Sequence, residues 1–323
     1  MFRIGVDVGG TNIAVGIVDD SYRIVAKKNV KTSEASEPSQ MIDAITEAVL
    51  GLMKLQGIGS AEVEAIGVGV PGTAEPESGK VLYANNLGFE DVAFLPVLKD
   101  KLGKELADKV YFDNDANAAA IGEYITGNYT ENSFAMVTLG TGIGGGIIIN
   151  GKVLRGCNYA AAEFGHMAIN IDGIDCNCGR KGCFEDYASA TALIDQAWEA
   201  MQTQAGRKSL LWTNVNEKAD LNGEKFFDAV RVNDTIALVV LNNYCYYLAE
   251  GLTNLINILQ PEVLVLSGGI TRAADLFLDK VKEKVAAGIY SRNSSRNTQI
   301  LLARGISDAG DVGIIGAALI DKM

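Results

Sequence analysis

The sequence predicts a two-domain α/β protein, and three observations support this. The chain has 323 residues, enough for two domains of ordinary size. Short apolar runs typical of strands are followed by segments with helical spacing, an order typical of mixed α/β layers. The layout of the first hairpin, GVDVGGTNIAVGIVDD, returns loosely in SFAMVTLGTGIGGGIIINGKVL. We therefore expect a duplicated unit, with each copy aiming a glycine turn at a shared cleft.

The N-terminal segment predicts strands, then a helix, then a strand. FRIGVDVG, NIAVGIVD and RIVAKKNV indicate a meander of three antiparallel strands. Pro38 then opens a helix that runs to about Gly57, with apolar residues at helical spacing. VEAIGVGVPG indicates a buried strand that Pro71 stops.

The rest of the chain repeats this scheme. VYFDND predicts a strand, and NAAAIGEYITG a helix that Asn114 or Asp115 could cap. A long helix is expected over Asn233–Gln260, ending before Pro261. EVLVLSGGI indicates a buried strand running into a glycine turn, and the tail GDVGIIGAALI a small-residue helix. The polar segment Gln202–Gly223 predicts a surface excursion.

Charge and apolar patterning exclude several classes of protein. The net charge is −12, which would repel phosphate backbones and anionic membranes, so no nucleic-acid or membrane partner is expected. No run approaches 18 apolar residues, and no signal peptide is evident. Five cysteines, an odd number, do not resemble a disulfide framework. A cytoplasmic protein is the expectation.

Three glycine turns follow apolar strands. They are DVGGT (Asp7–Thr11), LGTGIGGG (Leu139–Gly146) and SGGI (Ser267–Ile270). Backbone N–H groups exposed in such turns suit phosphate oxygens, although a single one could be a plain hairpin turn. DVGGT has the context of neither a Walker A loop nor a Rossmann fingerprint. Together the three indicate a nucleotide.

CNCGRKGC brings three of the five cysteines into eight residues. Cys176, Cys178 and Cys183 follow His166, the only histidine of the chain. Three thiolates and one imidazole make a complete tetrahedral zinc shell, which leaves no open position for catalysis. A structural zinc is the favoured interpretation.

Other interpretations of this cluster fit less well. A redox pair would prefer C-x-x-C, and a nucleic-acid zinc finger needs a basic helix that this acidic chain lacks. Inert buried thiols beside a lone histidine remain an alternative. Cys157 and Cys245 lie outside the cluster and are expected to be buried small apolar residues.

Several motifs together resemble the ROK family of bacterial sugar kinases. They are DVGGT, GVPG, DNDANAAA, TLGTGIGGG, the E-x-G-H of AEFGH, and CNCGRKGCFEDYAS. The most specific, C-x-C-G-x-x-G-C-x-E-x-x-x-S, matches Cys176–Ser189 at every fixed position, and the resemblance covers nearly the whole chain. One departure is Ala162, where the family usually has glycine, which bears on the local backbone and on sugar preference.

The resemblance implies an actin/hexokinase-like (ribonuclease-H-like) α/β fold with two domains around a cleft. A small domain would comprise residues 1–113 plus 308–323, and residues 114–307 would form a large domain carrying the zinc motif. Closure of the domains on sugar and a homodimer or higher homo-oligomer are implied in the same way.

The resemblance also implies the nucleotide site. The phosphates of ATP would be held by Asp7, Gly9, Gly10, Thr11, Asn12, Gly140, Thr141 and Gly142, with Gly268 and Gly269 beside the adenosine. Asp7 would be the water-mediated partner of Mg²⁺, the alternative being a buried structural carboxylate.

For the sugar, the resemblance implies a general base and several hydrogen-bonding partners. Asp115 would accept the hydroxyl proton; the alternative is that Asp113 and Asp115 are solvated or capping carboxylates. The other implied sugar-binding residues are Asn86, Asn114, Glu163, His166 and Glu185. Asn86 and its neighbour Asn85 could equally be turn residues. His166 would bind zinc through one nitrogen and face the sugar with the other.

The implied activity is ATP-dependent phosphorylation of a hexose, foremost D-glucose at O6. Fructose, mannose, allose and N-acetylmannosamine are alternative substrates. The family also holds sugar-sensing repressors with a DNA-binding segment before the kinase-like body, and DVGGT at residue 7 leaves no room for one. A non-catalytic sugar-binding module is the remaining alternative, although it would have little reason to keep Asp115 and both phosphate turns.

Overall fold

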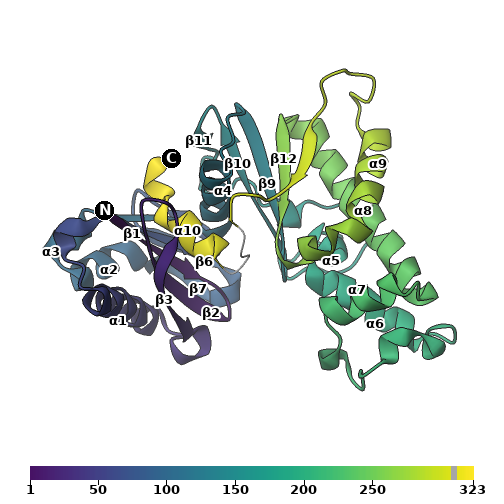
Figure 1. The fold of residues 1–323 in the computed structure, drawn as a ribbon, viewed down its shortest axis with the longest axis horizontal. Coiled ribbons are helices and arrows are strands. Elements are labelled where there is room, and N and C mark those ends of the chain that lie inside the picture. The colour runs from purple at the N-terminus through teal and green to yellow at the C-terminus, as the bar shows by residue number, and fades with distance from the viewer. Residues whose placement is uncertain (307–310) are drawn as a thin grey trace. The chain divides into compact units, whose positions relative to one another are not determined.

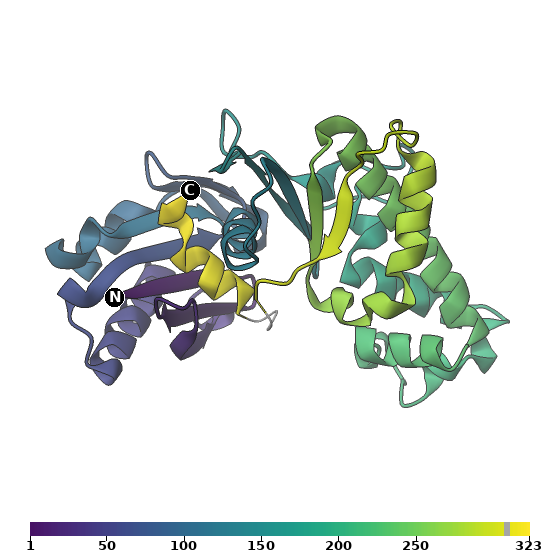
Figure 2. The ribbon, with the colours of Figure 1, turned by 45° about the horizontal axis from the view of Figure 1, so that its top comes forward.

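The structure is a computed structural model that describes residues 1–306 and 311–323. Two five-stranded sheets and one three-stranded sheet build the fold together with a set of helices (Figures 1 and 2). The predicted α/β class is therefore confirmed.

The first five-stranded sheet has the order β3-β2-β1-β4-β8. Its strands are β1 (Phe2–Val8), β2 (Asn12–Val18), β3 (Ile24–Lys31), β4 (Val63–Val70) and β8 (Val110–Asn114). The first three pair antiparallel, which confirms the predicted meander, while β4 pairs parallel with both β1 and β8. Parallel pairing brings the carboxyl ends of β1, β4 and β8 to one edge, where α/β proteins place ligands.

Helix α1 (Pro38–Gln56) forms where the sequence predicts it. Pro38 occupies the first helical position, and the N-cap Glu37 forms a capping box with Gln40 of the first turn. Gly57 ends the helix in the left-handed conformation at φ 66°. Its buried face packs against β2, β3 and α2 (Phe94–Leu102).

The tail helix α10 (Val312–Ala318) packs closely on β1, β4 and α4 (Asp115–Thr126). A Cβ atom on Gly5 would overlap the carbonyl of Ile314, and one on Gly67 the carbonyl of Ala317. The predicted small-residue helix is therefore confirmed, and glycines on the strands permit its approach. Gly310, where that prediction began, lies outside the described residues.

Several elements between β4 and β8 were not anticipated from the sequence. They are β5 (Thr73–Glu75), β6 (Lys80–Ala84), β7 (Phe89–Ala93), α2 and α3 (Lys104–Ala107). The three strands form an antiparallel sheet in the order β5-β6-β7.

The second five-stranded sheet repeats the strand order of the first, as β11-β10-β9-β12-β13. Its strands are β9 (Ser133–Leu139), β10 (Ile143–Ile149), β11 (Lys152–Val153), β12 (Val263–Ser267) and β13 (Gln299–Leu302). The predicted duplication is thus a repeat of topology, with a glycine turn joining the first two strands of each copy.

The remaining helices are α5 (Glu185–Ala188), α6 (Ala190–Gln202), α7 (Gly223–Arg231), α8 (Thr235–Leu259) and α9 (Leu278–Gly288). The long helix α8 contacts the other four. Asp234 caps it by accepting hydrogen bonds from the backbone of Ile236 and Ala237 at 3.0 and 2.9 Å. Gln260, at φ 45°, ends it directly before Pro261, as predicted.

The predicted surface excursion over Gln202–Gly223 is only partly right. The segment contains short 3₁₀ turns, and Leu211, Val215 and Leu221 are buried in it. The Ser209 hydroxyl also donates a hydrogen bond to the Asp234 carboxylate at 2.8 Å. These apolar side chains therefore anchor an otherwise polar segment. They are too widely spaced in the sequence to show a helical or strand periodicity.

The chain forms two compact units. The first comprises residues 1–134, 146–162 and 303–323, and the second residues 135–145 and 163–302. Helix α4 belongs to the first unit because it packs on α10 and β4. These ranges differ from the predicted domains, whose division stays a prediction, and the predicted boundary at residue 308 lies outside the described residues. Among the described helices, none is both long and apolar enough to cross a membrane.

Candidate active site

In the first unit, the DVGGT turn is closed by its own backbone. The Gly9 N–H donates to the Asn12 carbonyl at 2.9 Å, and the Thr32 hydroxyl donates to the Gly9 carbonyl at 2.8 Å. Gly10 and Thr11 at the tip are exposed. Asn86, on a 3₁₀ turn, lies beside this tip, since a Cβ atom on Gly10 would be 3.9 Å from the Asn86 Cβ.

Asp7 lies near the carboxyl end of β1, directly before this turn. Its carboxylate contacts the backbone of α10, where a Cβ atom on Gly313 would overlap it. Burial raises the pKa of Asp7 to about 6. A half-buried carboxylate with a raised pKa, next to an exposed glycine turn, fits a site that binds a cation together with phosphates.

The β8–α4 junction carries Asn114 and Asp115. Asn114 is the N-cap: its side-chain oxygen accepts from the backbone of Ala116 at 2.8 Å and of Asn117 at 3.1 Å. Its side-chain amide donates to the Gly72 carbonyl at 2.9 Å. Asp115 is the first helical residue, half-buried, and accepts from the Ala116 N–H at 2.8 Å. Of the two residues predicted as possible caps, Asn114 is the one that caps α4, so the cap is a neutral side chain.

Asp113 is not solvated. Only 1% of the residue is exposed, and its carboxylate pairs with Arg155, with 2.8 Å between Oδ2 and a terminal guanidinium nitrogen. This partner could not be found from the sequence, because Arg155 lies 42 residues away.

In the second unit, the turn between β9 and β10 is built from glycines. The Gly140 N–H donates to the Gly142 carbonyl at 3.0 Å, and the Gly140 carbonyl accepts from the Ala190 N–H at 2.8 Å. A Cβ atom on Gly142 would overlap Oε2 of Glu185. That same oxygen accepts from the Ile143 N–H at 3.2 Å. A predicted phosphate-binding turn and a predicted sugar-binding glutamate are therefore in contact.

The third glycine turn follows β12. Gly268 has φ 104°, and a Cβ atom there would overlap the Leu139 carbonyl. Only glycine fits both the angle and the space. Gly269 begins the 3₁₀ segment Gly269–Leu276. This turn therefore lies against the end of β9, from which the Gly140 turn starts.

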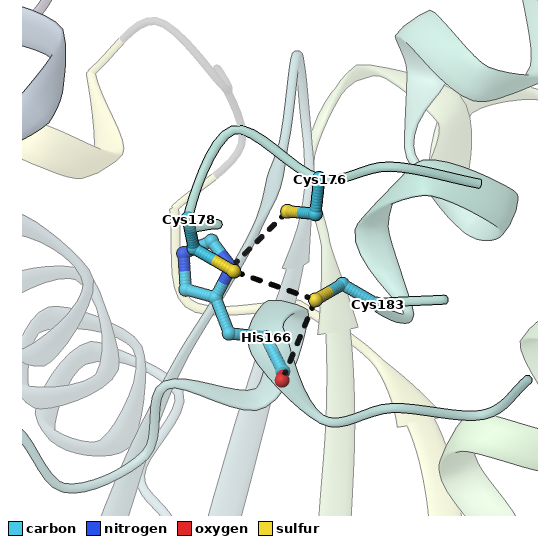
Figure 3. A group of neighbouring side chains, drawn as sticks. All are labelled: His166, Cys176, Cys178 and Cys183. Atoms are coloured by element: carbon cyan, nitrogen blue, oxygen red, sulfur yellow. Dashed lines mark hydrogen bonds between the residues drawn. The ribbon is translucent and has the colours of Figure 1, made fainter. Parts of the chain in front are cut away.

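The four predicted zinc ligands lie together (Figure 3). The Sγ atoms of Cys178 and Cys183 are 3.6 Å apart, and Sγ of Cys176 is 3.7 Å from Nδ1 of His166. A tetrahedral zinc with ordinary bond lengths requires about 3.8 Å between sulfurs and about 3.5 Å between sulfur and nitrogen. The sulfurs are too far apart for a disulfide. The donor set and its spacing thus fit Zn²⁺.

A short hairpin positions the three cysteines, while His166 ends the 3₁₀ turn Phe164–His166. The Cys176 N–H donates to the Arg180 carbonyl at 2.8 Å, and the Cys176 carbonyl accepts from Gly179 at 2.9 Å. Gly182 has φ 70°, and a Cβ atom there would overlap the Asn170 backbone. Burial raises the pKa values of the Cys176 and Cys183 thiols. Metal coordination would oppose that effect by stabilising the thiolates.

Glu163, His166 and Glu185 gather beside this hairpin. Nδ1 of His166 is 3.8 Å from Oε1 of Glu185. Desolvation is the main cause that raises the pKa of Glu163; the Glu185 charge adds to this effect and His166 opposes it. Zinc bound through Nδ1 would leave Nε2 as the second hydrogen-bonding atom of the ring. The three side chains thus form a polar cluster suited to hydroxyl groups.

A cavity of ≈ 660 Å³ opens next to the Gly140 turn. Thr141 lines it together with Ala190, Ile194 and Leu221, and Lys218 forms an ion pair with Asp195 at 2.8 Å on its wall. Its mostly apolar lining and its volume suit a small-molecule ring. Of these residues, only Thr141 was predicted from the sequence; Lys218 and Leu221 were missed because they lie in the segment predicted to be a surface excursion.

Comparison with known proteins identifies the family. Residues 3–322 match the ROK family. The chain belongs to this family. It is 34% identical to a glucokinase of Halalkalibacterium halodurans over 96% of this chain and 92% of the relative. It is also 34% identical to an N-acetyl-D-glucosamine kinase of Salmonella heidelberg, over 83% of this chain and 84% of the relative.

A solved structure resembles this ROK chain over its length. It is a ROK family glucokinase from Streptomyces griseus in complex with glucose and AMPPNP, with a TM-score of 0.81, 33% identity and 98% coverage of both chains. The predicted actin/hexokinase-like fold is thereby confirmed.

Two details of this ROK chain refine the sequence analysis. Ala162, the departure from the family pattern, has φ 66°, so the backbone keeps a left-handed conformation that favours glycine. The prediction that Cys157 is buried is wrong: it is exposed, because it follows Gly156 in a surface loop. Cys245 is buried, as predicted.

Proposed function

We propose that this protein is an ATP-dependent hexose kinase that transfers the γ-phosphoryl group of ATP to O6 of D-glucose. The observation that carries the proposal is the likeness, over 98% of the chain, to a ROK glucokinase bound to glucose and AMPPNP. The 34% identity to another glucokinase supports the same sugar.

The chemistry needs a group that accepts the hydroxyl proton and a polar site that orients the sugar. Asp115 is the proposed general base; as the first helical residue behind a capping asparagine, it is held in one place. Asn86, Asn114, Glu163, His166 and Glu185 are the proposed sugar-binding residues. Carboxylates and amides offer the fixed acceptors and donors that distinguish sugar hydroxyls.

The glycine turns are the proposed phosphate-binding elements. Asp7, Gly9, Gly10, Thr11 and Asn12 would form one, Gly140, Thr141 and Gly142 the other, with Gly268, Gly269 and the neighbouring cavity for the adenosine. When bound, Mg²⁺ supplies charge neutralisation on the phosphates, and Asp7 is its proposed water-mediated partner. The cavity's apolar wall supports a nucleotide as phosphoryl donor, because a base needs such a surface.

Zn²⁺ is proposed to be structural, with His166, Cys176, Cys178 and Cys183 as ligands. Four protein ligands fill a tetrahedral shell, so this metal would orient the His166 ring and not polarise a phosphate. From the family resemblance we also propose a cytoplasmic homodimer or higher homo-oligomer, with two domains in each chain that close on the sugar.

An assay of ADP release from Mg-ATP against free hexoses and N-acetylhexosamines tests the activity. We expect D-glucose to give the highest kcat/KM, and Asp115→Asn, which keeps the size of the side chain, to lower kcat by a factor of about 10²–10⁴. A higher kcat/KM for N-acetylglucosamine would favour the second candidate, which rests on the similarity to a kinase for that sugar. ADP release that no sugar stimulates would contradict both candidates.

A further inference from the structure

Asp113 is a buried carboxylate two residues before the proposed base, and a single arginine neutralises it. The Nε atom of Arg155 donates to Asp113 Oδ2 at 2.9 Å, and a terminal nitrogen lies 2.8 Å from the same oxygen. Only 2% of the Asp113 side chain and 24% of the Arg155 side chain are exposed. Two converging N–H donors on one oxygen fix the orientation of both groups, which a lysine could not do in the same way.

The other oxygen of Asp113 holds the β8–α4 turn. Oδ1 accepts from the backbone N–H of Asn114 at 2.8 Å and from the side-chain amide of Asn117 at 3.0 Å. Asn114 in turn caps α4, whose first residue is Asp115. The carboxylate therefore joins Arg155 on one side to the backbone that places Asp115 on the other.

Arg155 is itself anchored by its own loop. Its carbonyl accepts from the Ala161 N–H at 3.1 Å, which closes a loop over residues 155–161. Gly156, at φ 80°, allows this closure, since a Cβ atom there would be 3.1 Å from the Ala161 Cβ. The chain then continues through Ala162 directly into Glu163, a proposed sugar-binding residue.

We propose that Arg155 is a positioning residue for phosphoryl transfer, acting through Asp113 on the turn that carries Asn114 and Asp115. The effect on kinetics rests on the proposed function. The effect on the order of the turn rests on the contacts alone. A buried ion pair adds little net stability on average, whereas loss of one partner strands a charge. The role of the Asp113–Arg155 pair is therefore to fix the geometry of the turn that carries Asn114 and Asp115.

Arg155→Met should lower kcat about 100-fold, because displacement of a reacting group by about 1 Å has an effect of that size. The KM for the sugar should rise several-fold, since the Arg155 loop leads into Glu163. The KM for ATP should stay within about two-fold, because the glycine turns and the cavity belong to other segments. Arg155→Lys should retain an intermediate kcat, since it keeps the charge but not the two converging donors.

The experiment measures kcat and both KM values, thermal unfolding, and amide hydrogen exchange of residues 113–117 in the same set of proteins. The set is wild type, Arg155→Met, Arg155→Lys, Arg155→Ala with and without added guanidinium, and Asp113→Asn/Arg155→Met. Arg23→Met is the matched control: Arg23 makes the same pair of contacts with Asp19 Oδ2, at 3.0 and 2.8 Å, on an exposed turn.

In Arg155→Met we expect faster hydrogen exchange at the backbone amides of Asn114, Ala116 and Asn117, and in Arg23→Met no such change. Added guanidinium should restore the kcat of Arg155→Ala, whereas the same concentration of potassium chloride should not. A kcat per folded molecule equal to wild type in Arg155→Met would overturn it, as would a loss explained entirely by unfolding. If the wild-type protein phosphorylates no sugar, the proposed function fails. The exchange measurement still decides the inference, because unchanged exchange at the three amides overturns it.

Discussion

Gly142 and Glu185 are in contact: the α-carbon of the glycine lies so close to Oε2 of the glutamate that a methyl group at Gly142 would overlap that oxygen. The oxygen is held there by the Ile143 N–H at 3.2 Å. Through this contact, the turn proposed to bind phosphate fixes the position of a carboxylate proposed to bind the sugar.

Gly142→Ala should therefore displace Glu185 and raise the KM for glucose by about ten-fold or more, the effect of losing one good hydrogen bond to a charged group. Steady-state kinetics with glucose varied at saturating ATP measure this. Gly140→Ala is the control from the same turn, since a Cβ atom there would have 3.9 Å to its nearest neighbour, the Gly142 carbonyl oxygen. Equal glucose KM values in the two variants would contradict the steric argument.

Asp7→Asn should stabilise the protein without ligands at neutral pH while it lowers kinase activity. Burial raises the pKa of Asp7 to about 6, so as pH rises from the unfolded-state value of 3.8 the unfolded chain ionises first and the native state loses stability. Above pH 6, this difference in pKa lowers the free energy of unfolding by up to about 3 kcal/mol.

Urea unfolding at pH 4.0 and pH 7.5 tests this linkage. The Asp7→Asn substitution should raise the free energy of unfolding at pH 7.5 and leave it nearly unchanged at pH 4.0. Glu199→Gln, at an exposed position of α6, should change neither value. A destabilised Asp7→Asn protein at pH 7.5 would show that the ionised carboxylate is stabilised by its surroundings.

Ala162→Gly should raise the free energy of unfolding by about 0.5–1 kcal/mol. Ala162 has φ 66°, where an alanine side chain is strained, and relief of that strain outweighs the greater flexibility of glycine in the unfolded chain. Ala161→Gly, its neighbour at an ordinary φ, should instead lower the free energy of unfolding. Chemical denaturation of both variants compares them, and a loss of stability in Ala162→Gly would refute the strain.

Cys178→Ser should remove zinc and lower both stability and sugar affinity. Elemental analysis should find about one zinc per chain in the wild type and much less in the variant, with a lower melting temperature and weaker glucose binding by calorimetry. Cys157→Ser is the control, because that thiol is exposed and outside the cluster. A zinc-free wild-type protein with full glucose affinity would exclude the structural metal.

Local signals in the sequence determined most of the secondary structure. Pro38 and Gly57 delimit α1, and Pro261 marks the end of α8, because turns and caps depend on residues close in the chain. The gathering of His166, Cys176, Cys178 and Cys183 was predictable for the same reason, because the four residues are close in sequence; that they bind zinc stays a prediction. The repeated glycine hairpin indicated the duplicated topology, which the matching strand orders confirm.

Only the tertiary structure decided which side chains meet over long separations. The pairing of Asp113 with Arg155 and the contact of Gly142 with Glu185 join residues more than 40 positions apart in sequence, as do the walls of the cavity. The exposure of Cys157 was likewise settled by packing. Such contacts leave no periodic pattern, because each is fixed by how folded strands and loops approach one another and not by neighbours along the chain.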